Sequence, residues 1–303
     1  MYPCPSPFAM GASKKGILVA AFNSGVLSTS ADGITWTTVV NPLGTGFPGM
    51  TNGCYANGLF VIGDFSGDII TSPDGVNWTS RTSNLSGSSY AISYGAGLFV
   101  AVGQSGRYST SPDGITWTSR SAIGGSDLRC ITYANGYFAL GTYNGNFYTS
   151  TNGTSWTLRT TGFSGAAILS VAYNSGVWKF GTSNGYVYTS SDFVSWSHVT
   201  LSGSQVAFMI SAANYFFACD NSGVLYYNLS NGGWNTISGA GNTQGFGGLG
   251  YSPSLGLFLA APFDSNCDIG TSHSLPGSWT ARTSHADTIS AGEWMFGNIL
   301  TNF

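Results

Sequence analysis

The stretch SPDGITWT, residues 111–118, returns along the chain with small changes and decides the fold. Seven segments align with it: SADGITWT (30–37), SPDGVNWT (72–79), SPDGITWT itself, STNGTSWT (150–157), SSDFVSWS (190–197), NLSNGGW (228–234) and HSLPGSW (273–279). Their tryptophans are Trp36, Trp78, Trp117, Trp156, Trp196, Trp234 and Trp279, at successive separations of 42, 39, 39, 40, 38 and 45 residues. A period of about 40 residues without a helical pattern is typical of one four-stranded blade per repeat. We therefore predict an all-β fold, a seven-bladed β-propeller of four-stranded antiparallel blades.

Each repeat supplies four runs that read as strands. In the third repeat they are AISY (91–94), GLFVAVG (97–103), GRYSTS (106–111) and ITWTSRS (115–121), in order from the axis outward. Asn57-Gly58 and Asn135-Gly136 predict tight hairpins between the first two strands, because both central residues of a type I′ turn need positive φ. The Ser-x-Asp-Gly segment predicts the turn between the third and fourth strands, where the Ser and Asp side chains bond local amides.

The repeated tryptophans predict packing between neighbouring blades. A ring at one fixed register per blade can be buried where adjacent sheets meet. Burying about 150–250 Å² at about 25 cal/mol per Å² contributes roughly 4–6 kcal/mol per ring before entropy is counted. We therefore interpret all seven as structural residues and assign none to a ligand.

These segments resemble the Asp-box, or bacterial neuraminidase repeat, which reads S-x-D-x-G-x-x-W. That motif recurs in sialidases, sortilin-like receptors, photosystem-assembly propellers, some fungal lectins and phage tail proteins. Here Asp and Gly are adjacent in the first three copies, Asn152 replaces Asp in the fourth, Phe193 replaces Gly in the fifth, and the last two copies are degenerate. The resemblance covers nearly the whole chain and implies a propeller, but the motif is a folding element in all these families and implies little about activity.

A ring of blades has to close, and the two ends of the chain carry complementary pieces of a repeat. Residues 17–30 resemble second and third strands, and residues 288–296 resemble the first two. We expect residues 1–303 to form one propeller domain in which C-terminal strands within residues 287–303 complete the N-terminal blade and remove its open edge. The alternative is an eighth partial blade, since PFAMGA (7–12) could itself be an inner strand.

Composition excludes several classes of function. Only 7% of the 303 residues are charged and the net charge is −3, so no electropositive footprint for nucleic acid exists. No apolar run approaches the roughly 18 residues of a membrane helix, and the N-terminus lacks the pattern of a Sec signal. The five cysteines are widely spaced without a CxxC pair, which favours buried free thiols over disulfides or zinc.

The sialidase resemblance implies an arginine triad, a Tyr–Glu pair and an acid–base Asp, and the sequence does not match that set. Four of the six arginines, Arg81, Arg120, Arg159 and Arg282, follow a repeat Trp by three residues and belong to the repeat. Arg107 and Arg129 remain, and Glu293 is the one glutamate. The chain has three histidines, one of which, His273, replaces a repeat Ser, and this argues against a Ser-His-Asp hydrolase. From the sequence we predict that the chain is not an enzyme, with no catalytic residues.

We expect any ligand on the face that carries the hairpins between second and third strands and the loops between blades. The longest of those loops are residues 41–51 and 238–248, and function concentrates on loops of a rigid scaffold. A shallow carbohydrate site could form from non-repeat aromatics and an amide; an equally good alternative is that these rings pack loops or face a partner subunit. The predicted ligand residues are Phe47, Tyr143, Phe163, Phe246 and Gln104.

Two equivalent hairpins carry paired carboxylates, Asp64 with Asp68 and Asp264 with Asp268. The D-x-N-x-D spacing of the second pair resembles part of a calcium loop, although the downstream Glu is missing. Turn stabilisation is the simpler interpretation. We therefore predict no cofactor, with Ca²⁺ at these residues as the alternative.

High Gly, Ser, Thr and Asn, low charge and the resemblance to phage tail repeats lead to a functional hypothesis. The chain is expected to be a virion component, on a phage tail or surface, that acts as an adhesin or structural module. Its partners would be other virion or assembly proteins and host cell-surface glycans, with no nucleic acid and no membrane insertion. The alternatives are a free carbohydrate-binding lectin, secreted without a Sec signal, and, less favoured, a sialidase-like glycosidase.

Overall fold

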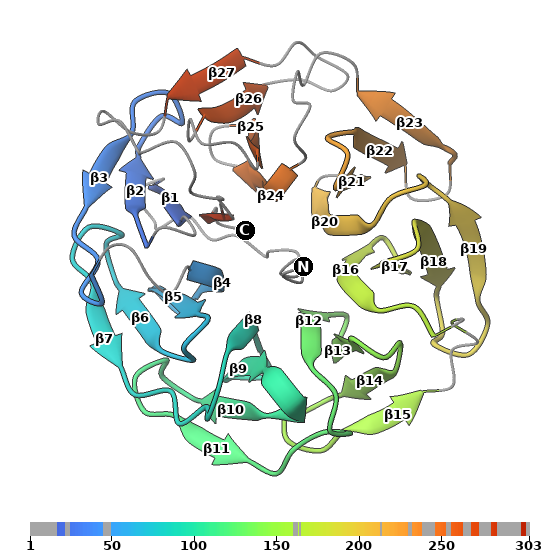
Figure 1. Ribbon diagram of the computed structural model, residues 1–303, viewed down its shortest axis with the longest axis horizontal. Coiled ribbons are helices and arrows are strands. Elements are labelled where there is room, and N and C mark those ends of the chain that lie inside the picture. Colours follow the sequence, from blue (N-terminus) through green and yellow to red (C-terminus); the bar gives the residue numbers. More distant parts are fainter. Residues whose placement is uncertain are drawn as a thin grey trace.

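Seven four-stranded antiparallel sheets are arranged around a central axis in the computed structural model (Figure 1). The structure describes residues 17–21, 25–44, 50–159, 163, 165–212, 214–229, 232–237, 246–252, 256–262, 268–272, 280–283 and 298–300. The predicted seven-bladed propeller is confirmed, and the described residues form no eighth sheet. We number the blades from the one that contains the first strand of the chain.

The innermost strands are β28 (Asn298–Leu300), β4 (Met50–Ala56), β8 (Ser89–Gly95), β12 (Leu128–Ala134), β16 (Ile168–Asn174), β20 (Val206–Ala212) and β24 (Phe246–Ser252). The second strands are β1 (Leu18–Ala21), β5 (Leu59–Asp64), β9 (Leu98–Gly103), β13 (Tyr137–Thr142), β17 (Val177–Thr182), β21 (Tyr215–Asp220) and β25 (Leu257–Pro262).

The third strands are β2 (Leu27–Ser30), β6 (Ile69–Ser72), β10 (Tyr108–Ser111), β14 (Phe147–Ser150), β18 (Tyr186–Ser190), β22 (Leu225–Leu229) and β26 (Asp268–Ser272). The outermost strands are β3 (Thr37–Val39), β7 (Thr79–Arg81), β11 (Thr118–Arg120), β15 (Thr157–Arg159), β19 (Ser197–Thr200), β23 (Trp234–Ile237) and β27 (Thr280–Thr283). A 3-10 turn, η1 (Gln104–Gly106), follows β9.

The ring closes as predicted, by pairing of the two ends of the chain. In blade 1 the order is β28-β1-β2-β3, so the C-terminal strand supplies the innermost position. Ile299 lies opposite Ala20 in this antiparallel pair. Residues 288–296, which the sequence assigned to the closing segment, lie outside the described residues, as do residues 1–16; that the domain spans 1–303 stays a prediction.

The turn between the third and fourth strands, which we call the repeat turn, is built by side chains. In blade 3 the Ser111 Oγ accepts the Gly114 N–H and donates to the Asp113 carboxylate, which accepts the N–H groups of Ile115 and Thr116 at 2.8 Å. Because those amides belong to the turn, the outermost strand begins at Thr118 and not at Ile115 as the sequence pattern indicated.

Six repeat tryptophans lie within the described residues, and each packs against a buried cluster that includes side chains of the preceding blade. These are Trp36, Trp78, Trp117, Trp156, Trp196 and Trp234. Trp117 is 3% exposed and the other five are half-buried. Trp279 lies outside the described residues. The core is thus a set of apolar layers between blades, one of which joins blade 7 to blade 1 through Leu257 and Leu259.

Cys54, Cys130 and Cys219 are buried free thiols, as the sequence indicated. Burial raises the pKa of Cys130 to about 12, so this thiol stays protonated at neutral pH. In the described part of the chain, no helix has the length and apolar character needed to cross a membrane.

Candidate functional site

The hairpins between second and third strands are tied to the loops that enter each blade, which places both on one face of the ring. The backbone N–H of Gln104 donates to Ser88, that of Tyr143 to Asp127, and that of Ser183 to Ala167, at 2.9–3.0 Å. This is the face on which the sequence placed a ligand. We call it the loop face.

Innermost strands carry a β-bulge near the loop face. In β8 the register shifts between Ser89 and Ala91, which leaves Tyr90 in the bulge, and in β12 it shifts between Leu128 and Cys130, which leaves Arg129 there. Bulges re-aim side chains and recur beside functional sites. Here they bring a tyrosine of blade 3 to an arginine of blade 4.

Arg129, Tyr90, Tyr143 and Asp127 form what we call the arginine cluster. The Arg129 guanidinium carbon lies 4.4 Å from the centre of the Tyr90 ring and 4.9 Å from that of Tyr143, within cation–π range. Its Nη2 donates to the Asp127 carboxylate at 2.8 Å. The Phe65 ring, from the hairpin of blade 2, meets the Tyr90 ring edge-on, with 6.3 Å between the ring centres. The cluster therefore joins blades 2, 3 and 4 on the loop face.

Asp127 connects the cluster to its surroundings. One carboxylate oxygen accepts the Arg129 bond and the other accepts the backbone N–H of Ser105 at 2.9 Å, while its carbonyl accepts that of Tyr143. The predicted ligand residue Gln104 precedes Ser105 and is exposed. Asp127 thus holds Tyr143 directly, and on the adjacent hairpin it holds Ser105, the residue after Gln104.

Burial sets the electrostatics of this cluster. Desolvation lowers the pKa of Arg129, which the nearby Tyr90 and Asp127 counteract, and an arginine stays charged in any case. Desolvation also raises the pKa of Tyr90, with Arg129 opposing the shift and Asp127 adding to it. At neutral pH Arg129 is thus a cation that packs on the neutral Tyr90 phenol and pairs with the Asp127 side chain.

Tyr143 is the member of the cluster that faces solvent. Its side chain is 56% exposed, whereas Tyr90 is 6% and Arg129 3% exposed. One part of the Tyr143 ring rests on the guanidinium and the rest is free. A ring held in place in this way can stack on a ligand without first losing much conformational freedom.

Phe163, the one other predicted ligand residue whose side chain the structure describes, does not join this cluster. The centre of the Phe163 ring lies 4.2 Å from that of Tyr188 and 5.0 Å from that of Trp196. Phe163 thus packs in the apolar layer between blades 4 and 5. Phe47 and the Phe246 side chain lie outside what the structure describes.

Asp64 and Asp68 form a turn of blade 2. One Asp64 carboxylate oxygen accepts the backbone N–H groups of Ser66 and Asp68, at 2.9 and 2.7 Å. No group of three or more His, Cys, Asp or Glu side chains that could hold a metal occurs among the described residues. Asp264 and the Asp268 side chain lie outside them, so the alternative of calcium binding there is not tested.

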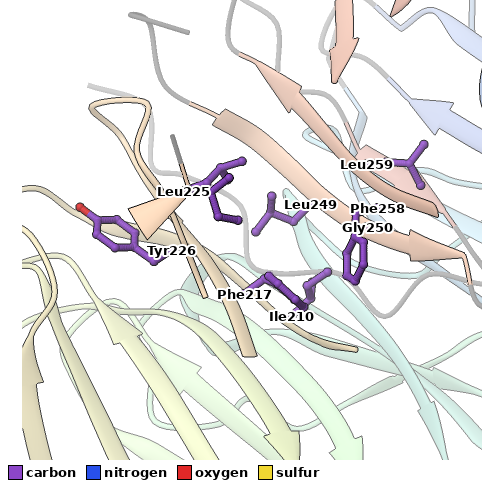
Figure 2. A pocket seen from close by; sticks show the side chains of 9 residues that line it. Ile210, Phe217, Leu225, Tyr226, Leu249, Gly250, Phe258 and Leu259 are labelled. Atoms are coloured by element: carbon purple, nitrogen blue, oxygen red, sulfur yellow. The ribbon is translucent and has the colours of Figure 1, made fainter. Parts of the chain in front are cut away.

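Two hollows differ in size and character. A pocket of about 10 Å³ between blades 6 and 7 is lined by Ile210, Phe217, Leu249 and other apolar groups, whose side chains are drawn in Figure 2. It has room for one water at most and is a packing gap. A groove of about 580 Å³ between blades 2 and 3 is lined by Asp68, Asn84 and several hydroxyl groups.

The sequence interpretation missed Arg129, Tyr90, Asp127 and Phe65. Arg129 did carry a signal, because it is one of two arginines that do not follow a repeat Trp by three residues. In the described repeats those other arginines make a repeated bond: the Nε of Arg81, Arg120 and Arg159 each donates to a threonine of the third strand. Arg129 lies at a different position in its repeat, so this repeated bond does not explain why an arginine is found there.

No protein-family model and no curated protein sequence matches the chain. Solved structures match its fold. A streptogramin B lyase is 12% identical, with a TM-score of 0.74 over 89% of this chain and 94% of that one. YCF48 from Cyanidioschyzon merolae is 14% identical, with a TM-score of 0.60 over 77% and 84%, and the computationally designed Ika8 protein is 14% identical, with a TM-score of 0.63 over 95% and 93%. At these identities the likeness shows the propeller fold alone.

The lyase corrects one prediction. From the sequence we predicted that the chain is not an enzyme, and the likeness to the streptogramin B lyase contradicts that prediction, because the same fold carries catalysis there. The sequence argument excluded only the sialidase and Ser-His-Asp arrangements. A propeller can place other reactive groups on its loops, so the missing motifs did not justify the general exclusion.

Proposed function

We propose that this chain is a ligand-binding propeller of a phage-type virion, an adhesin or structural module of the tail or surface, which holds host glycans on its loop face. The observation that carries the binding role is the exposed Tyr143 ring supported by the buried Arg129. Aromatic rings bind the apolar faces of sugars, and neighbouring amides and carboxylates bond their hydroxyls. In this proposal the exposed amide of Gln104 and the carboxylate of Asp127 take that second task.

The virion assignment is supported by the sequence. Its repeats resemble those of phage tail proteins, and a surface with few charges and many Ser, Thr, Asn and Gly residues suits packing against other assembly proteins. A free lectin would use the same site. Labelled antibodies against this chain that decorate purified particles would support the virion role, and detection only in the particle-free supernatant would contradict it.

The glycan role is tested with a glycan array and one pair of variants. Tyr143→Ala should reduce binding at least tenfold, about 1.4 kcal/mol, because the stacking surface is lost. Leu158→Ala is the matched control, since Leu158 is 57% exposed on the outermost strand β15, away from the cluster. An array without hits, or equal losses for the two variants, would contradict the proposal.

A further inference from the structure

Arg129 is a buried cation that leaves most of its hydrogen-bonding groups unused. A guanidinium has five N–H bonds, and Asp127 accepts from Nη2. Nε and Nη1 are both buried and have no partner among the described protein atoms. Leaving buried charged donors unpaired costs more free energy than leaving neutral ones unpaired. This arrangement is therefore retained at a cost to stability that binding of a suitable acceptor would remove.

The chemistry of the free donors selects the acceptor. A carboxylate matches a planar guanidinium in both charge and geometry, and a charge-assisted bond is about twice as strong as a neutral one. Asp127 neutralises one positive charge, and Arg107, exposed on the adjacent hairpin, adds another. The surroundings thus favour an anion over a neutral hydroxyl.

Tyr143 packs on the guanidinium that carries these donors. It contacts the guanidinium at 4.9 Å and is the most exposed member of the cluster. Tyr143 follows the last residue of β13, and Gly145 lies two residues further on at φ 81°, so the ring sits on a short hairpin at the protein surface. Rotation of this one side chain would open Arg129 to the loop face.

We propose that Arg129 binds the carboxylate of an acidic sugar when the Tyr143 ring swings aside, so that the glycan held on the loop face is one that carries carboxylates. This inference rests on the proposed function in taking the glycan as the ligand of this face. It adds that the ligand is anionic and that Tyr143 both stacks on it and admits it.

The test uses glucuronate as the probe and glucose, at matched ionic strength, as the neutral control. The readout is the Nε–H signal of Arg129 in a ¹H–¹⁵N spectrum, identified by its loss in Arg129→Gln. Glucuronate should shift this signal saturably and glucose should not. Tyr143→Ala, which removes the stacking surface, should raise the glucuronate concentration needed for half of this shift at least tenfold, and Asp127→Asn, which removes the competing carboxylate, should tighten binding at least threefold.

If Arg129→Gln fails to fold, the Asp127→Asn and Tyr143→Ala comparisons still decide the matter. Equal responses to glucuronate and glucose, or no response in either of these variants, would overturn the inference and leave bound water as the partner of Arg129. Glycan-array hits confined to neutral sugars would accompany that result. A glucuronate response beside an empty array would instead contradict the host-glycan role and leave the carboxylate site standing.

Discussion

Two aspartates at equivalent positions, Asp64 and Asp220, have different surroundings. Each ends a second strand and accepts two turn amides on one carboxylate oxygen. The second oxygen of Asp220 accepts the Tyr226 hydroxyl at 3.0 Å, but that of Asp64 is buried without a partner because Ile70 stands where Tyr226 does. Burial raises the pKa of Asp64 to about 6, and the nearby Asp68 carboxylate adds to the shift.

This difference predicts a stability that falls as the pH rises. The pKa of the Asp64 carboxyl is about 6 in the folded protein, against an ordinary value of 3.8 in the unfolded chain. Because the folded protein holds this proton more tightly, the free energy of unfolding falls as the pH rises from about 4 to 6, by at most roughly 3 kcal/mol. Urea unfolding at pH 4.5 and pH 7 should show this loss in the natural chain and a smaller one in Asp64→Asn. Asp220→Asn is the control. Equal pH dependence in the natural chain and Asp64→Asn would exclude Asp64 as the cause.

Neighbouring blades depend on one another through the repeat turn. A Cβ on Gly114 would lie 2.7 Å from Leu59, and one on Gly153 would lie 2.9 Å from Val100, both in the preceding blade. In blade 5 this position is Phe193, with φ 61°, and its ring fits because Ala139 replaces the valine found at this register in the blades before it. A larger residue on the turn is therefore matched by a smaller one across the interface.

Replacing Ala139 and Phe193, singly and together, tests this coupling. Ala139→Val alone should overpack the interface and cost about 1–3 kcal/mol, and Phe193→Gly alone should leave a cavity and cost about 3–5 kcal/mol, less the relief of the left-handed backbone. The double variant reproduces the pairing of blades 3 and 4 and should recover at least about 1 kcal/mol relative to the sum. Urea unfolding of the natural chain, the two single variants and the double variant measures this coupling free energy. Strict additivity of the two losses would show that the side chains at positions 139 and 193 do not contact each other.

The repeat explains why the elements were predictable from sequence and the site was not. Asn57-Gly58 and Asn135-Gly136 do adopt positive φ, because that turn admits few other residues. The arginine cluster instead depends on bulges in β8 and β12, which no residue type demands. Tyr90 and Arg129 lie 39 positions apart and meet only once two blades are packed, so composition could indicate Tyr143 and Gln104 but not the cation beneath the ring.

At the scale of the whole ring, stability depends on how blade 1 is completed. The described cysteines form no disulfide, and strand pairing joins β28 to β1. All four residues of β1 are buried, at 0–1% exposed. Without β28 their backbone groups and apolar side chains would form an open edge, which pairs readily with other chains.

Deleting residues 298–303 should therefore convert the closed ring into an open one that associates or precipitates. Size-exclusion chromatography and thermal unfolding measure this, with deletion of residues 301–303 alone as the control that keeps β28. A peptide of residues 288–303 added in excess should raise the melting temperature of the truncated chain, because it restores the missing strand by mass action. A truncated chain that stays monomeric and melts with the natural one would mean that the three residues of β28 do not hold the ring, and that closure comes from the apolar contact between blades 7 and 1.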